Sequence, residues 1–412
     1  MNDLRRSALE RFRTLGFPTS RDEEWRFTSV ASVAEGRFLL ARDGVASLRP
    51  ADIAPVRLPT ETAATLVFVN GRYAAGASEL RALPPGVRVE SLRAPSELAR
   101  LLHSHLGQIA ASDRHPFVAL NTAFLLDGAC ISVPDSVAIP APIHLIFVTV
   151  PEGGPVMAHP RVLLIAGRES QTRLVESYVG PPGAAYFTNT VTEVFADVAA
   201  HVDHYRIQEE GSSSAHIGAL FVRAGRDTTV TCHSVSLGGA LVRNDVVAVL
   251  DGEGSTCTLN GLYLADGRAL VDNHTTIDHA RPHCDSREIY KGILAGRGRA
   301  VFNGKIIVRP DAQKTDAKQT NRALLLSEAA QIHTKPQLEI FANDVRCTHG
   351  AAVGQMDDEA VFYLRARGLD ESQARELLIR AFAGDVLNRM SIEPLGARLV
   401  ETLSARVHGG AA

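Results

Sequence analysis

The sequence lacks the features that define several common protein classes. Its 412 residues include only five cysteines, at positions 130, 232, 257, 284 and 347, and no two of them form a CxxC pair. An odd number without such a pair does not support a disulfide scaffold. No stretch approaches the roughly 18 apolar residues of a membrane-spanning helix, and the amino-terminal residues have no apolar core of signal-peptide length. We therefore expect a cytoplasmic protein that is not embedded in a membrane.

An excess of charge of one sign is also missing. Lys and Arg total 43 against 46 Asp and Glu, so the formal net charge is only -3. A chain without an overall basic field is not expected to bind nucleic acid. Aromatic residues make up only 6% of the chain, which argues against a carbohydrate-active enzyme that stacks sugars on rings, although we keep that class as a remote alternative.

Motifs that bind nucleotides or activate a serine are absent as well. The nearest approach to a Walker A loop is "GRAVFNGKI", which has five residues between its glycines and an isoleucine after Lys305. The chain has no GxSxG elbow, and no GxGxxG opens a helix after a strand. We therefore expect that this chain does not itself bind ATP.

What the sequence does contain is a long β-rich region. From about 130 to 350, short runs rich in Val, Ile, Thr and Tyr alternate with Gly, Asp and Asn, which predicts an all-β body. Two segments echo each other at an offset of 44 residues: "LDGEGSTCTLNGLYL" from Leu250 and "LAGRGRAVFNGKIIV" from Leu294. The echo favours a solenoid, with two coils of about 22 residues, over a β-sandwich, which the pattern alone leaves open.

Helices are expected on both sides of this body. The first thirty residues predict two helices, the second starting near Ser20, with Trp25 anchoring this arm to the body. After residue 356, "EAVFYLRAR" predicts a helix capped by Asp357 or Asp358, and Asp370 begins another with one apolar face. The expected sections are a helical and mixed region over 1–115, a β core over 116–355 and a helical domain over 356–412.

Two histidine clusters suggest metal ligands, but neither completes a site. His201 and His204 would point to opposite faces of a strand, so one ion could not easily take both. His279, His283 and Cys284 are of ligand type, yet no second closely spaced pair completes a tetrahedral zinc set.

The segment "DVRCTHG" carries a third candidate, Cys347 with His349. In a strand these two side chains share one face, about two strand rises apart, and could contact the same metal ion or cluster. Iron–sulfur clusters usually take about four protein ligands, so a second chain would have to supply the others. Spacing alone still favours a core cysteine and a histidine at a turn.

Several segments together resemble one family. The segment "TKPQLEIFANDVRCTHGAAVGQMDDEAVFYLRARGL", from Thr334 to Leu369, is similar to the most characteristic part of the SufB/SufD family of the SUF iron–sulfur cluster assembly machinery. "FNGKIIVRPDAQKTDAKQTN", "GFPTSRDEEWRFT" and "LVFVNGRY" resemble it too. SufB has a glutamate-containing histidine motif where this chain has "CTHGAAVG", and many SufB sequences carry an N-terminal cysteine motif that is absent here. The resemblance therefore favours the SufD branch over a SufB-like paralogue.

The resemblance implies a fold and a role. The family fold is a right-handed parallel β-helix core flanked by an N-terminal helical region and a C-terminal α-helical domain. The implied role is a non-catalytic scaffold subunit that pairs with SufB through the β-helix and docks the SufC ATPase through its C-terminal helices. A transient iron–sulfur cluster would form at the SufB interface, with His349 as the principal residue of this chain and Cys347 as a secondary one.

Two further expectations come from the resemblance. Residues of the first C-terminal helix are expected to contact SufC, namely Glu359, Tyr363, Leu364 and Arg367. Reduced FAD is associated with the family's complex, but no residue of this chain can be assigned to it. A homodimeric scaffold, formed without SufB, stays open as an alternative.

Overall fold

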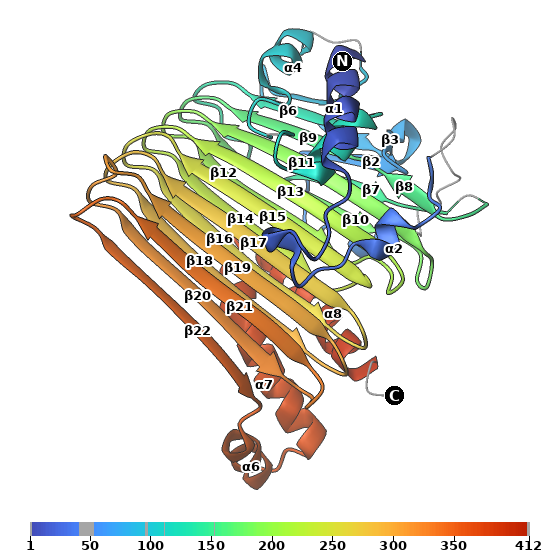
Figure 1. Ribbon diagram of the computed structural model, residues 1–412, viewed down its shortest axis with the longest axis vertical. Coiled ribbons are helices and arrows are strands. Elements are labelled where there is room, and N and C mark those ends of the chain that lie inside the picture. Colours follow the sequence, from blue (N-terminus) through green and yellow to red (C-terminus); the bar gives the residue numbers. More distant parts are fainter. Residues whose placement is uncertain (1, 41–52, 95–97, 111, 152, 410–412) are drawn as a thin grey trace.

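Parallel strands form a long stack with helices at both of its ends (Figure 1). The computed structural model describes residues 2–40, 53–94, 98–110, 112–151 and 153–409. Consecutive strands of the stack lie alternately in two sheets, and each pairs in parallel with the strand one coil away. The expected mainly-β solenoid is confirmed, and the sandwich alternative is wrong.

The two sheets run the length of the solenoid. Sheet A contains, in pairing order from its C-terminal end, β21 (Gln331–Ile340), β19 (Arg299–Val308), β17 (Leu270–His279), β15 (Leu241–Leu250), β13 (Ala215–Ala224), β11 (Tyr186–Ala196), β9 (Arg161–Ala166), β6 (Gly128–Val133) and β5 (Arg88–Ser91), with β8 (Val156–Ala158) and β1 (Leu39–Leu40) beside it. Sheet B contains β22 (Arg346–Gln355), β20 (Asp316–Leu325), β18 (Asp285–Leu294), β16 (Thr256–Ala265), β14 (Thr229–Ser236), β12 (His201–Gln208), β10 (Gln171–Val179), β7 (Ile143–Val148), β2 (Ala64–Val69) and β3 (Arg72–Tyr73), with β4 (Glu79–Leu80) paired to β2.

The coils are longer than the sequence echo suggested. Leu241 of β15 is the register partner of Leu270 of β17, so one coil there takes 29 residues, not about 22. The two echoed Asn-Gly pairs consequently lie in different sheets, one in β16 and the other in β19. The offset of 44 residues is therefore about one and a half coils. The two segments look alike because each begins with a similar corner turn of the solenoid.

The N-terminal region lies over the outer face of sheet A and the first coils. It contains α1 (Asn2–Leu15), η1 (Glu23–Trp25), α2 (Ala31–Ala34), η2 (Ala54–Val56), η3 (Ala75–Ala77), α4 (Ala99–His105) and α5 (Pro116–Ala123). The helix expected from Ser20 is wrong: only the single 3₁₀ turn η1 forms there. The Asp22 carboxylate accepts the Thr19 N–H at 2.7 Å and makes no cap to a following helix.

Trp25 anchors this arm, as expected. Its ring is buried and packs 5.3 Å from the ring of Phe117, and the Arg243 guanidinium lies 4.1 Å from its centroid. Behind α4 and α5, the buried ion pair of Arg161 and Glu193 (2.6 Å) joins adjacent strands of sheet A. The Glu193 carboxylate also accepts the N–H of Gly107, which ties the region after α4 to the sheet.

The C-terminal helices are α6 (Asp358–Ala366), α7 (Glu371–Leu387) and α8 (Glu393–Gly409). Asp357 caps α6, and a capping box of Asp370 and Gln373 begins α7. Apolar residues of α7 and α8 pack on the outer face of sheet B, whereas α6 projects beyond the last coil (Figure 1). None of the helices in the described part of the chain is long and apolar enough to cross a membrane.

Candidate functional site

The last coil of the solenoid has two free edges. β21 ends sheet A and β22 ends sheet B, and among the described residues no strand pairs with their outer sides (Figure 1). Nearly every residue of β22 is exposed, and Phe341, between the two strands, is 62% exposed. Open edges are templates for strand pairing with another chain, so this end of the solenoid is a candidate interface.

Cys347 and His349 lie on β22 at this open end. They are the register partners of Ala317 and Gln319 on β20, which are both buried and face the interior of the solenoid. Strand alternation therefore directs Cys347 and His349 to the same, inward face. His349 is exposed because none of the described strands continues the solenoid past β22.

The two side chains differ in their chemical environment. Cys347 is half-buried and packs against the apolar cluster that contains Ile306 and Ala317. Burial raises the pKa of the Cys347 thiol above its ordinary value, and the nearby Asp316 carboxylate raises this pKa further. Because a thiol must lose its proton to bind iron, the raised pKa makes iron binding by Cys347 less favourable in the isolated chain.

A row of polar side chains leads from the interior to His349. Glu288, Gln319 and His349 are successive register partners on β18, β20 and β22. The Nε2 of Gln319 donates to Oε2 of Glu288 at 2.7 Å, and both residues are almost completely buried. Burial raises the pKa of Glu288 to about 7, and the hydrogen bond from Gln319 limits this rise. This row could not be predicted from the sequence, because only the pairing register shows that residues about thirty positions apart are neighbours.

A second exposed feature lies between α6 and α7. Phe362 and Tyr363 of α6 are 73% and 57% exposed, and Leu377 of α7 is 46% exposed. These side chains line an apolar groove together with Asp357, Glu359, Ala360, Leu364, Ala366, Leu378 and Ala381. Large apolar side chains gathered on one exposed surface are typical of a protein-binding site.

The four helix residues singled out from the sequence occupy this part of α6 or follow it directly. Glu359, Tyr363 and Leu364 line the groove, whereas Arg367 follows the helix and donates a hydrogen bond to the Tyr363 hydroxyl at 2.7 Å. Phe362, the most exposed of the large apolar residues that line the groove, was not among the four. The sequence pattern of a helix does not show which of its faces packs against the rest of the protein, so the exposure of Phe362 could not be predicted.

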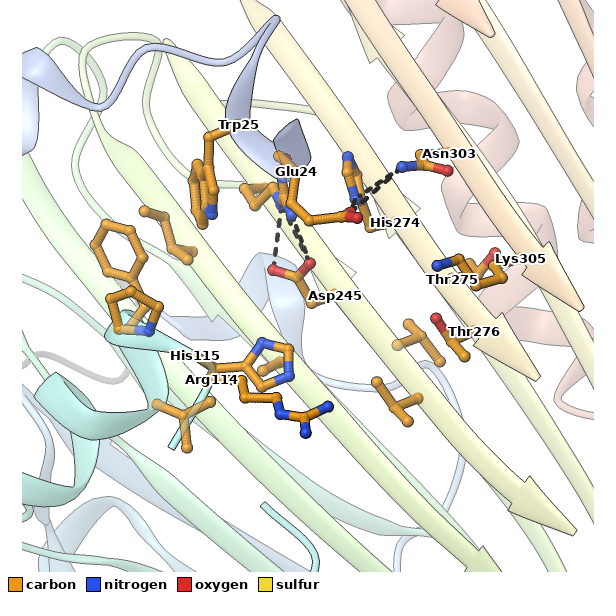
Figure 2. Close-up of a pocket in the computed structure, with 18 of the residues that line it drawn as sticks. Glu24, Trp25, Arg114, His115, Asp245, His274, Thr275, Thr276, Asn303 and Lys305 are labelled. Carbon is orange, nitrogen blue, oxygen red and sulfur yellow. Dashed lines mark hydrogen bonds and ion pairs between the residues drawn. The ribbon is translucent and has the colours of Figure 1, made fainter. Parts of the chain in front are cut away.

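The N-terminal arm closes a third feature, a cavity of about 400 Å³ against sheet A. Figure 2 shows Glu24 reaching toward His274 and Asn303, while Arg114 and His115 lie on the opposite side. His274 contacts the carboxylates of Glu24 and Asp272, each at 3.1 Å. The contacts across this cavity join the arm to three strands of the solenoid.

The other histidine candidates lie apart from one another. His204 is buried and bonded to Glu176 at 2.7 Å, whereas His201 is exposed, as alternation along the strand predicts. His279 is buried beside Ser286, and His283 lies in an exposed turn. Within the described ranges, no group of three or more His, Cys, Asp or Glu residues is arranged to hold a metal ion.

Two family models together match most of the chain. Residues 147–382 match the family described as "SUF system FeS cluster assembly, SufBD core domain", and residues 1–145 match the SufBD protein N-terminal region. An iron–sulfur cluster assembly SufBD family protein of Synechocystis is 34% identical over 98% of this chain and 90% of its own length.

Two further relatives cover most of the chain. The iron–sulfur cluster assembly protein SufD of Escherichia coli is 31% identical over 98% of this chain and 92% of its own length. The chloroplastic protein ABCI7 of Arabidopsis thaliana is 30% identical over 94% of this chain and 82% of its own length. The chain therefore belongs to the SufBD family of iron–sulfur cluster assembly proteins of the SUF system.

Proposed function

We propose that this chain is a non-catalytic scaffold subunit, which pairs with SufB through the open end of its solenoid and docks the SufC ATPase through its C-terminal helices. The cluster is the cargo of the assembly and is held only transiently. The single observation that carries the proposal is the position of His349: a ligand-type side chain, facing inward, on the last strand of a solenoid whose end is uncovered.

The open end supports pairing with a second β-solenoid. The outer edges of β21 and β22 offer backbone donors and acceptors, and the exposed interior of the last coil offers apolar contacts. A partner that adds strands to both edges would satisfy these backbone groups by hydrogen bonding and would cover the exposed interior of the last coil. SufB, which shares the family's solenoid, fits both requirements, and a second copy of this chain is the competing occupant.

The ligand chemistry supports a site shared between two chains. His349 and Cys347 provide at most two ligands, and about four are usual for a cluster. A partner chain would therefore contribute the rest, with His349 as the principal ligand on this side and Cys347 as a secondary one. Mixed imidazole and thiolate ligation generally holds a cluster less tightly than four thiolates, which suits a cluster that must be passed on.

The groove between α6 and α7 supports the docking of SufC. Its exposed rings of Phe362 and Tyr363 are of the residue type that dominates protein interfaces. α7 packs on sheet B through the apolar cluster that includes Ile379 and Val386, so a force applied to the helices would reach the solenoid. ATP-driven closure of two SufC subunits could in this way open the SufB interface.

Compartment and cofactors complete the proposal. All five cysteines are free thiols, which fits the reducing conditions of the cytoplasm. In this proposal nucleotide is bound by SufC and not by this chain, and reduced FAD associates with the complex without an assigned residue here.

The proposal is tested by mixing the chain with purified SufB and SufC under anaerobic conditions and measuring the mass of the product. A stable assembly that contains all three chains supports the proposal. A chain that remains alone, or forms only a homodimer in the presence of SufB, contradicts the pairing. Removing residues after 356 should abolish SufC binding and leave SufB binding intact.

A further inference from the structure

Gln319 is the immediate neighbour of His349 in sheet B. The two residues are register partners on β20 and β22, and both lie in the row that faces the interior. Adjacent strands are about 4.8 Å apart, so side chains at the same level can contact each other. Gln319 is only 1% exposed, whereas His349 is exposed at the open end.

Two contacts fix the amide group of Gln319. Its Nε2 donates to Glu288 Oε2 at 2.7 Å on the preceding strand of the same sheet. Across the interior, Gly304 of β19 leaves room for the amide: a Cβ atom at that position would lie 2.3 Å from the Gln319 Nε2. A side chain at position 304 would therefore displace the Gln319 amide.

The other amide atom, Oε1 of Gln319, is buried and accepts no hydrogen bond from any of the described residues. An unsatisfied buried acceptor costs about 1–3 kcal/mol, so a structure that retains one generally has a reason for it. Because Glu288 holds the Nε2, the oxygen stays available as an acceptor. The next residue in the row is His349, whose ring can supply a donor.

We propose that Gln319 is a positioning residue for His349: its Oε1 accepts the Nδ1–H of the neutral imidazole and leaves the Nε2 lone pair for iron. Nδ1 is the ring nitrogen nearer the backbone of the strand. Metal-binding histidines are commonly oriented in this way through the ring nitrogen that does not bind the metal. The inference deepens the proposed function and rests on it for the role of iron, but the contact itself can be tested without a cluster.

The contact is tested in the full chain by NMR of ring-¹⁵N-labelled histidine, with the His349 signal assigned by its loss in His349→Gln. In the wild type, we expect His349 to carry its proton on Nδ1. In Gln319→Leu the proton should redistribute toward Nε2. A wild-type proton on Nε2, or no change in Gln319→Leu, overturns the proposal.

The consequence for cluster assembly is tested in the complex with SufB and SufC. Gln319→Leu should lower the cluster content about 10-fold or more, as the loss of outer contacts to metal ligands commonly does. Thr320→Val, one position along on the outward face of β20, is the matched control and should behave as wild type. Unchanged cluster content in Gln319→Leu overturns the positioning role. Retention of the cluster by His349→Ala would instead refute the proposed function. The NMR result would in that case still show whether Gln319 accepts the Nδ1–H of His349.

Discussion

Val353 and Ala323 are register partners on neighbouring strands, yet Val353 is 46% exposed and Ala323 only 5%. Inward-facing side chains at the same level of the solenoid are thus buried on β20 and exposed on β22. An interior row that ends in exposed apolar side chains indicates a missing neighbour, and the proposed neighbour is the solenoid of SufB.

The exposed end predicts a specific loss of pairing. Val353→Asp places a charge where an apolar side chain would be buried, which should weaken SufB binding by at least about 10-fold, since burying a valine contributes roughly 1.5–3 kcal/mol. Ala352→Asp puts the same charge one position earlier on the outward face and serves as the control. Binding is measured by isothermal titration calorimetry, and equal effects of the two variants would argue against pairing through the interior row.

The α6–α7 groove predicts a separate loss of SufC binding. Phe362→Ala should weaken that binding by about 10-fold or more, because a central aromatic residue of an interface commonly contributes 2 kcal/mol or above. Arg365→Ala changes an exposed residue of the same helix that does not line the groove, and should have little effect. Binding of both variants to SufB should be unchanged. Undiminished SufC affinity of Phe362→Ala would refute the groove as the docking site.

Cys347 is predicted to contribute less than His349. The raised pKa of its half-buried thiol makes loss of the proton, which iron binding requires, less favourable. Cys347→Ser should therefore retain more than about half of the cluster content of the complex, as measured by iron and acid-labile sulfide. A loss as complete as that of His349→Ala would show that the thiol is an obligatory ligand.

Docking of the N-terminal arm is predicted to depend on pH through His274. Burial and the Arg243 charge oppose its protonation, but Asp272 and the hydrogen bond to Glu24 outweigh them and raise the pKa of His274. A raised pKa means that protonated His274 stabilises the docked arm at low pH, in full below about pH 6.5, and that this contribution is lost as the pH rises through the folded-state pKa.

Trp25, the only tryptophan, reports directly on this arm. Its fluorescence emission should shift toward longer wavelengths as the pH rises from about 6.5 to 9. His274→Gln cannot become charged, so its emission should show much less pH dependence over that range. A wild-type emission that does not change with pH would contradict the role of His274.

The sequence predicted much of this molecule, for physical reasons that can be named. Strand alternation alone placed Cys347 and His349 on one face, because the two-residue period of a strand is local. The coil length could not be obtained in the same way. The 29-residue separation of Leu241 and Leu270 depends on corner turns of variable length, and the Asn-Gly echo joined segments from different sheets.

The spatial neighbours of His349 could not be predicted from the sequence for a related reason. Glu288 and Gln319 are 31 positions apart, and Gln319 and His349 are 30 positions apart, so only the register reveals the row. The exposure of Phe362 likewise depends on which face of α6 remains free after the other helices have packed on sheet B.

The cluster content of the anaerobic complex tests the central claim most directly. Iron and acid-labile sulfide are measured after assembly with SufB and SufC, for the wild type, for His349→Ala and for Thr348→Ala, whose side chain lies on the opposite face of β22. We expect all three to form the complex, and His349→Ala alone to lose nearly all of its cluster. A His349→Ala complex that holds as much iron and sulfide as the wild type would contradict the assignment of His349 as the cluster ligand.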